Sequence, residues 1–149
     1  MKIQNILLKQ IMKVLNVAEK NDAAKSLALI MSNGTSRMRQ SYSPYNKIYE
    51  FNLQLFNRQN TMLMTSVSGH LLSLEFIQQY KGWTSCSPEE LFSAQVAKGC
   101  PENYELIKKS LEKEVRDCDK LIIWTDCDRE GENIGILIKY YYYFLKFYF

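Results

Sequence analysis

The class of fold can be inferred from one stretch of sequence, LIIWTDCDREGE (121–132). Its first four residues form a continuous apolar run, which is typical of a central strand covered on both faces. The acidic residues that follow stand beyond the carboxyl end of that strand, where α/β folds place their ligands. From Asn133 onward the pattern becomes helical. The stretch therefore predicts a strand, a ligand site and a helix, in that order.

Strands and helices alternate through the rest of the chain. Residues 13–18 are a β-prone run, and residues 23–31 carry apolar side chains at helical spacing after two candidate capping residues, Asn21 and Asp22. Two strand-like runs, 48–56 and 61–67, predict a hairpin. Residues 88–98 and 103–118 predict two helices, with Glu114 among the charged side chains on the solvent face of the second. The fold class is α/β, with a mostly parallel sheet, one antiparallel hairpin and flanking helices.

Length and composition bound the possibilities. The chain has 149 residues, of which 46% are hydrophobic, and this is room for one domain with a core. Low counts of glycine and proline exclude a disordered or collagen-like chain. The net charge of +3 indicates no particular partner. Four cysteines without a CxxC pair, and one histidine, indicate reduced thiols in an intracellular protein.

The apolar C-terminal run raises the question of a membrane. Lys139 and Lys146 interrupt it, and it is shorter than the roughly 20 residues that a spanning helix needs. We therefore expect no membrane partner.

Asp126, Asp128 and Glu130 follow the apolar run at two-residue spacing. In an extended chain they would project to one side and repel one another unless a cation lay between them, and Mg²⁺ suits such carboxylates. Glu19 stands just past another predicted strand, so it would face Asp126 and Asp128 if the two strands are neighbours. The simpler alternative is an acidic turn stabilised by the N-terminus of the following helix.

Two basic residues accompany these carboxylates. Lys20 follows Glu19, and Arg129 lies between Asp128 and Glu130. Either side chain could hold a phosphate, and for Lys20 a solvated lysine of the first helical turn is an equal alternative.

Three strings of sequence carry a family resemblance. VAEKNDAAKSLA (17–28), TSVSGHLL (65–72) and WTDCDREGENIG (124–135) resemble the Toprim domain of type IA DNA topoisomerases, in particular the eukaryotic topoisomerase III branch. NKIYEF (46–51) and CPENY (100–104) are similar to the same branch. The similarity runs in order from about residue 13 to residue 135, which makes it more specific than a short acidic motif alone.

The resemblance implies a Rossmann-like Toprim fold that holds Mg²⁺ beside the scissile phosphate of single-stranded DNA. It makes Glu19 the catalytic glutamate, which assists proton transfer at the 3′ oxygen and is also a candidate metal ligand. Asp126 and Asp128 become Mg²⁺ ligands, and Glu130 completes the acidic motif. Lys20 would stabilise charge on the phosphate, and His70 and Arg129 are expected near DNA.

The family's nucleophilic tyrosine lies beyond the Toprim domain, and none of the chain's tyrosines stands in a matching context. We therefore predict that this chain alone neither cleaves nor relaxes DNA. The resemblance further implies a RecQ-type helicase and an OB-fold accessory protein as partners, and a location in the nucleus.

The expected organisation is an N-terminal extension (1–12), a Toprim domain (13–135) and an aromatic tail (136–149) in which the resemblance is lost. Four tyrosines followed by phenylalanines show no amphipathic period that would bury one face. We therefore expect a truncated topoisomerase, cut within the helix after its acidic motif. Two alternatives remain: a stand-alone Toprim nuclease or primase-like phosphoryl-transfer enzyme, and a non-catalytic DNA-binding fragment.

Overall fold

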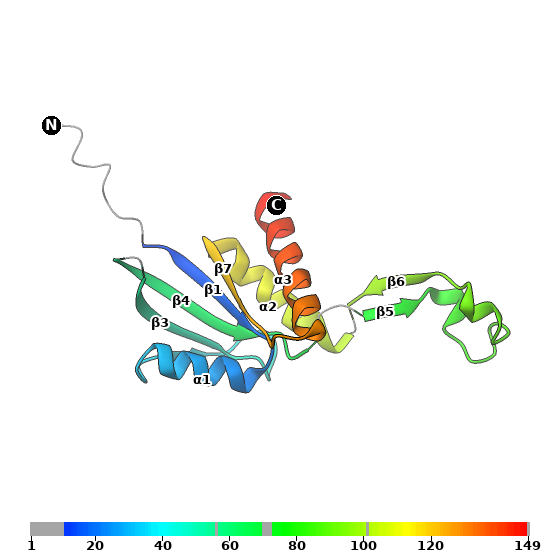
Figure 1. Ribbon diagram of the computed structural model, residues 1–149, viewed down its shortest axis with the longest axis horizontal. Helices are drawn as coiled ribbons and strands as arrows, with labels where there is room; N and C mark the ends of the chain where they lie inside the picture. The colour runs from blue at the N-terminus through cyan, green and yellow to red at the C-terminus, as the bar shows by residue number, and fades with distance from the viewer. Residues whose placement is uncertain (1–10, 56, 70–72, 101, 149) are drawn as a thin grey trace.

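The computed structural model describes residues 11–55, 57–69, 73–100 and 102–148. A mixed five-stranded sheet forms the centre of the molecule (Figure 1), in the order β2-β3-β4-β1-β7. β1 pairs in parallel with β4 and β7, whereas β3 pairs antiparallel with β2 and β4. The strands are β1 (Lys13–Ala18), β2 (Arg37–Arg39), β3 (Ile48–Leu55), β4 (Arg58–Ser66) and β7 (Lys120–Trp124). The predicted α/β class and hairpin are confirmed.

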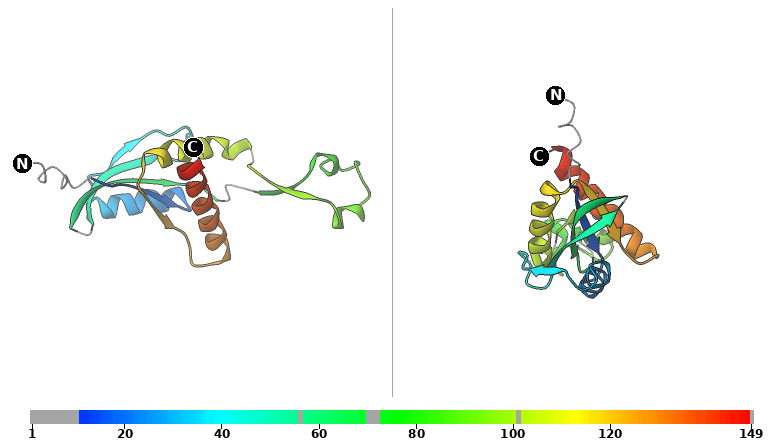
Figure 2. Two further views of the ribbon diagram at one scale, coloured as in Figure 1. Left: turned by 90° about the horizontal axis from the view of Figure 1, so that it is seen from above. Right: turned by 90° about the vertical axis from the view of Figure 1, so that its left-hand side faces the viewer.

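Helices cover both faces of the sheet (Figures 1 and 2). Successive side chains of a strand point to opposite faces, so each face of the sheet carries apolar side chains that a helix can bury. On one face, Leu15 and Val17 of β1 pack with residues of α2 (Glu105–Asp117) and α3 (Arg129–Tyr148). On the other face, Val14 and Ala18 pack with residues of α1 (Asn21–Met31). The result is a three-layer arrangement with two apolar cores.

A buried amide ties the centre of the sheet together. Asn16 of β1 is fully buried, and its Nδ2 donates to the carbonyl oxygens of Val14 and Leu63, each at 3.3 Å. Its Oδ1 accepts a hydrogen bond from Trp124 Nε1 at 3.1 Å. A buried polar group is costly unless it is hydrogen-bonded, so these contacts favour one arrangement of β4, β1 and β7.

β7 is the strand that precedes the acidic residues. We expected a central strand, and in this the prediction was wrong: β7 lies at the edge of the described sheet, beside β1. Both of its faces are nevertheless packed, with Leu121 and Ile123 toward the α2–α3 core and Ile122 and Trp124 toward the α1 core. A continuous apolar run therefore reports packing on two faces and not a central position.

Residues 88–98 do not form the predicted helix. They contain one short 3₁₀ turn, η2 (Glu90–Phe92), and the start of β6 (Val96–Gly99), which pairs antiparallel with β5 (Ser73–Phe76). Further 3₁₀ turns are η1 (Gln78–Tyr80) and η3 (Glu102–Tyr104). Figures 1 and 2 show the β5–β6 pair projecting from the sheet, so the apolar residues of 88–98 have no core surface to face. Phe92 is accordingly 96% exposed.

The aromatic tail is part of α3, which continues without a break to Tyr148. Ile134, Ile138, Tyr142 and Leu145 are all buried, and their spacing is that of one helical face. The expectation of no such period was wrong, because it weighed Tyr140–Tyr143 as a block and not by position. Tyr141 OH also donates to Glu112 Oε1 of α2 at 2.6 Å.

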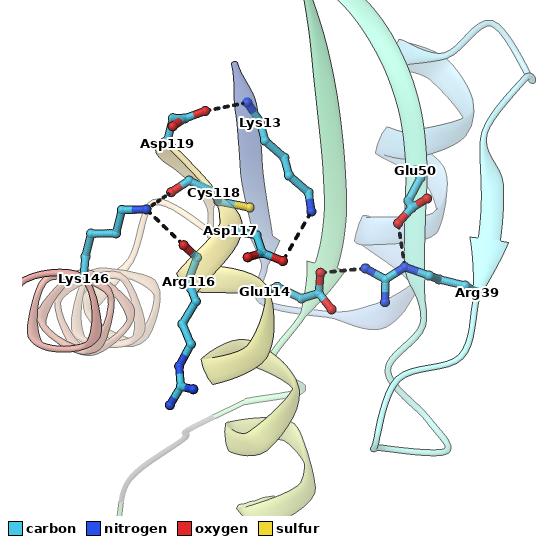
Figure 3. Close-up of polar contacts among 9 residues, drawn as sticks. All are labelled: Lys13, Arg39, Glu50, Glu114, Arg116, Asp117, Cys118, Asp119 and Lys146. Carbon is cyan, nitrogen blue, oxygen red and sulfur yellow. Dashed lines mark hydrogen bonds and ion pairs between the residues drawn. The ribbon is translucent and has the colours of Figure 1, made fainter. Parts of the chain in front are cut away.

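The side of α2 opposite α3 carries an ion pair that the sequence did not predict. Glu114 was expected to face solvent, but its side chain is only 4% exposed and accepts a 2.6 Å hydrogen bond from Arg39 Nη2 (Figure 3). Arg39 Nε also donates to Glu50 at 2.6 Å.

Lys146 of α3 holds the end of α2 on its other side. Figure 3 shows its Nζ donating to the carbonyl oxygens of Arg116 and Cys118, at 3.2 and 2.8 Å.

Two smaller findings complete the fold. Asn21 and Asp22 do not cap α1, since Lys20 takes the N-cap position and makes no side-chain capping bond. In the part of the chain that the structure describes, no helix has the length and apolarity required to cross a membrane.

Candidate functional site

The carboxyl ends of β1 and β7 lie side by side. Their parallel register pairs Ala18 with Trp124, and Glu19 N donates to Trp124 O at 2.9 Å. The residues after these strands therefore meet at one edge of the sheet. The two strands are neighbours as expected, and Glu19 faces Asp126 across their ends. Asp128 instead accepts a hydrogen bond from the first turn of α3.

Three side chains come together at this edge. Glu19 is 7% exposed, and its Oε2 accepts a hydrogen bond from the Asp126 backbone N–H at 3.3 Å. Lys20 Nζ lies 2.8 Å from Asp126 Oδ2 and 3.4 Å from Glu19 Oε1. The hydrogen bonds to Asp126 and to Glu19 raise the pKa of Lys20 above its ordinary value, because both carboxylates stabilise the ammonium. The site has a positive charge placed between two carboxylates.

Asp128 is held differently. Its Oδ1 accepts the Gly131 backbone N–H at 2.7 Å, which is the contact of a helix-capping aspartate. Glu132 N donates to Asp128 O at 3.0 Å, and α3 begins at Arg129. The extended spacing considered for the three carboxylates therefore ends at Asp128, and Glu130 stands in the first helical turn.

A close backbone approach at Gly131 shapes the acidic turn. A Cβ at this position would lie 2.0 Å from Asp126 O, closer than any real contact. Only glycine allows the start of α3 to fold back against the loop that carries Asp126. The sequence predicts this helix only from Asn133 onward, whereas α3 begins at Arg129 and has Gly131 in its first turn, where a glycine is otherwise unfavourable.

The loop after β4 forms a third side of the site. Val67 N donates to Ala18 O at 3.0 Å, and Gly69 N donates to Glu19 O at 3.4 Å. Ser68 and Gly69 both have positive φ, at 55° and 107°. His70, expected near DNA, lies outside the described residues.

Two residues that the sequence analysis did not assign hold this loop in place. Asn46 Nδ2 donates to Ser66 Oγ and Ser68 Oγ, each at 2.8 Å. Tyr104 OH donates to Ser68 O at 3.1 Å. Both residues lie within the strings that carry the family resemblance, but only the fold brings them to the β4 loop.

The fit of a divalent metal depends on these carboxylates. Glu19, Asp126, Asp128 and Glu130 offer hard oxygen donors of the kind that Mg²⁺ prefers. Among the residues that the structure describes, no three acidic, histidine or cysteine side chains are gathered closely enough to hold a metal ion. The carboxylate oxygens therefore fit a divalent metal by their chemistry. The Lys20 ammonium lies between Glu19 and Asp126, and Asp128 Oδ1 already accepts a hydrogen bond from α3.

Comparison with known proteins defines the class. The Toprim domain family matches residues 14–147, which includes most of the aromatic tail. The chain belongs to this family, as its sequence predicts.

The relatives define the branch. The chain is 57% identical over 131 residues to human "DNA topoisomerase 3-alpha", which covers 88% of this chain. It is 56% identical over 126 residues, or 85% of the chain, to the protein of the same name from Drosophila melanogaster. It is 43% identical over 129 residues, or 83% of the chain, to "DNA topoisomerase 3" of Saccharomyces cerevisiae. The resemblance to the topoisomerase III branch is therefore confirmed.

The chain is much shorter than these relatives. The matched region makes up 13% of the human protein, 10% of the Drosophila protein and 20% of the yeast protein. The chain thus corresponds to the Toprim domain of its relatives.

Proposed function

We propose that this chain supplies the Toprim part of a type IA DNA topoisomerase, which cleaves, passes and religates single-stranded DNA. The observation that carries the proposal is the meeting of Glu19, Lys20 and Asp126 at the ends of two neighbouring parallel strands. Carboxylates for a divalent ion and an ammonium for a phosphate are what phosphoryl transfer needs at one place.

Each side chain has a proposed role. Glu19, Asp126, Asp128 and Glu130 would hold Mg²⁺, which when bound supplies positive charge beside a phosphate oxygen. Glu19 would also carry a proton for the 3′ oxygen of the cleaved strand, since it is the buried carboxylate of the group. Lys20 would bind the phosphate, and Arg129 and His70 would contact DNA.

The chain alone is proposed to be inactive in relaxation. Strand cleavage in the family needs a tyrosine outside the Toprim domain, and none of the tyrosines here lies in a matching sequence. The ability to relax negative supercoils and to resolve recombination intermediates would therefore belong to a longer protein that contains this domain. A RecQ-type helicase and an OB-fold protein are its proposed partners, and the nucleus its proposed location.

The proposal can be tested by exchange of domains. Residues 13–135 would replace the corresponding region of human DNA topoisomerase 3-alpha, and relaxation of negatively supercoiled plasmid would be measured with Mg²⁺. We expect the chimera to relax DNA, and Glu19→Gln or Asp126→Asn within it to reduce the rate by about 100-fold or more, because each removes a group of the reacting site. The 149-residue chain alone should leave the plasmid unchanged.

The controls separate the alternatives. An Asp22→Asn chimera alters an exposed carboxylate of α1 near the site and should stay active. Relaxation by the isolated chain would contradict the proposal, whereas Mg²⁺-dependent nicking by the isolated chain, abolished in Asp126→Ala, would support the stand-alone nuclease. A folded chimera without activity would favour the non-catalytic alternative.

A further inference from the structure

Lys20 makes a contact that joins two strand ends. It directly follows Glu19 in the chain, yet its ammonium lies closer to Asp126, which is 106 residues away, at 2.8 Å against 3.4 Å for Glu19. The lysine therefore bridges the carboxylate after β1 and the carboxylate after β7. A solvated lysine of a first helical turn needs neither contact.

The bridge leaves Glu19 fully partnered. Its Oε2 accepts the Asp126 backbone N–H and its Oε1 faces the Lys20 ammonium. A carboxylate that is 7% exposed is costly without such partners. Lys20 thus performs the electrostatic task that a bound cation would perform between the same two carboxylates.

The same contact bears on how a metal ion could use this pair of carboxylates. Two positive charges between one pair of carboxylates would repel each other, and an Oδ2 at 2.8 Å from an ammonium is already committed. A metal ion at Glu19 and Asp126 therefore has to displace the ammonium.

The bridge is also easy to displace. The side chains of Lys20 and Asp126 are each 64% exposed, and exposed ion pairs contribute little free energy. The lysine stem is long and reaches solvent directly, so leaving requires rotation of one side chain and no change in the backbone. The bridge can hold the two carboxylates together without blocking the approach of a metal ion.

We propose that Lys20 is an internal cation that occupies the Glu19–Asp126 pair in the metal-free domain and is displaced when a divalent ion binds. This inference rests on the proposed metal site. A lysine that supported the metal site would weaken metal binding when removed. The proposal predicts the opposite change in affinity: removal of the Lys20 charge strengthens metal binding. It also means that the ammonium becomes available to an anion only after the metal has arrived.

The first test measures Mn²⁺ binding to the 149-residue chain by electron paramagnetic resonance, with Mn²⁺ as a hard divalent probe of carboxylate sites. Lys20→Gln should lower the Kd for Mn²⁺ by about two- to fivefold, the range that loss of a weak exposed ion pair allows. Lys20→Arg keeps the charge and should bind no more tightly than the unmodified chain. Lys25→Gln removes one positive charge from the exposed surface of α1 and should change the Kd by less than about twofold.

The second test follows the lysine itself. Acylation of the unmodified chain by an activated ester, read by mass spectrometry, should show Lys20 reacting faster with Mn²⁺ than without it, while Lys25 reacts equally in both. Equal Lys20 reactivity in a sample that binds Mn²⁺, or weaker binding in Lys20→Gln, would overturn the inference.

Asp126→Asn separates this inference from the proposed function. If Mn²⁺ binds the chain equally well with Asp126→Asn, or binds neither the chain nor Lys20→Gln, the metal site itself is wrong and the inference falls with it. If Asp126→Asn weakens binding and Lys20→Gln does not strengthen it, the metal site stands and only the internal cation is rejected. Binding that is detectable only in Lys20→Gln would support both.

Discussion

Cys118 shows what burial does to a single titratable group. Its thiol is fully buried beside the α2–α3 core, and this burial raises its pKa from 9 to about 12. Because the pKa in the folded state exceeds that of the unfolded chain, the native protein keeps a proton that the unfolded chain loses above pH 9. The associated stability is complete below pH 9 and is lost between pH 9 and about 12.

Cys118→Ala should therefore flatten the alkaline limb of the stability profile. In the unmodified chain the Cys118 proton contributes a fall in the free energy of unfolding of up to about 1.4 kcal/mol per pH unit in this window. The measurement is urea unfolding followed by circular dichroism, at steps from pH 8 to 11. Lysines and the raised pKa of half-buried Tyr141 affect both proteins alike. The pKa of Tyr142 is raised mainly by burial and in part by Cys118, so the difference between the two slopes reports Cys118 together with its effect on Tyr142. Parallel profiles would contradict the assignment.

Among the site residues, the sequence predicts position better than contact. Glu19 and Asp126 could be placed together because each follows a β-prone run, and the ends of parallel strands share one edge. The capping bond of Asp128 could not be predicted because it depends on where α3 begins, and the bridge by Lys20 could not be predicted because it depends on the conformations of two exposed side chains. Glu114 was misplaced for a similar reason, since its partner Arg39 comes from a strand 75 residues away.

Among the elements, α3 has two glycines in its first turns, and they differ in whether a Cβ could be accommodated there. A Cβ at Gly131 would lie 2.0 Å from Asp126 O, a backbone atom that cannot move aside cheaply. A Cβ at Gly135 would lie 3.7 Å from Ile123 Cγ2, an ordinary contact. One glycine is therefore needed by the site and the other is not.

Gly131→Ala and Gly135→Ala form a matched pair. Gly131→Ala should destabilise the protein by about 1–3 kcal/mol, because the acidic turn must shift to relieve the overlap. Gly135→Ala should be neutral or stabilise by up to about 1 kcal/mol, because alanine favours the helix. Urea unfolding of both variants measures the two values, and equal effects would show that Gly131 has no special approach to the loop.

The elements that were predicted correctly are those whose periodicity matches a buried surface. β1 is buried along almost its whole length and the apolar residues of α1 repeat against the core, and the bounds of β1 coincide with the prediction. Residues 88–98 show a helical period with nothing to pack on, so the period was misleading. The aromatic tail gave the opposite error, since its helical face is real but hidden among exposed tyrosines.

At the scale of the molecule, two segments far apart in sequence build one sheet. β1 and β4 precede the projecting β5–β6 segment, whereas α2, β7 and α3 follow it. The pairing of β1 with β7 and the shared core on the α2–α3 face therefore join the two halves of the chain independently of that segment. Within residues 74–99, no described side chain is fully buried, and Trp83 is 99% exposed.

A segment without a core of its own opens at lower free energy than the sheet from which it projects. Brief digestion with chymotrypsin should therefore cut first between residues 76 and 92, where Tyr80, Trp83 and Phe92 are accessible, and not in β1, β4, β7 or α3. The two products should elute together by size exclusion, because β1–β7 pairing and the α2–α3 core hold them, and should separate only in urea. Intact-mass spectrometry identifies the cut.

Two outcomes would contradict this account. A first cut among Tyr140–Tyr143 would mean that the end of α3 is not packed as described. Separation of the two products in buffer would mean that the projecting segment is needed to hold the sheet together.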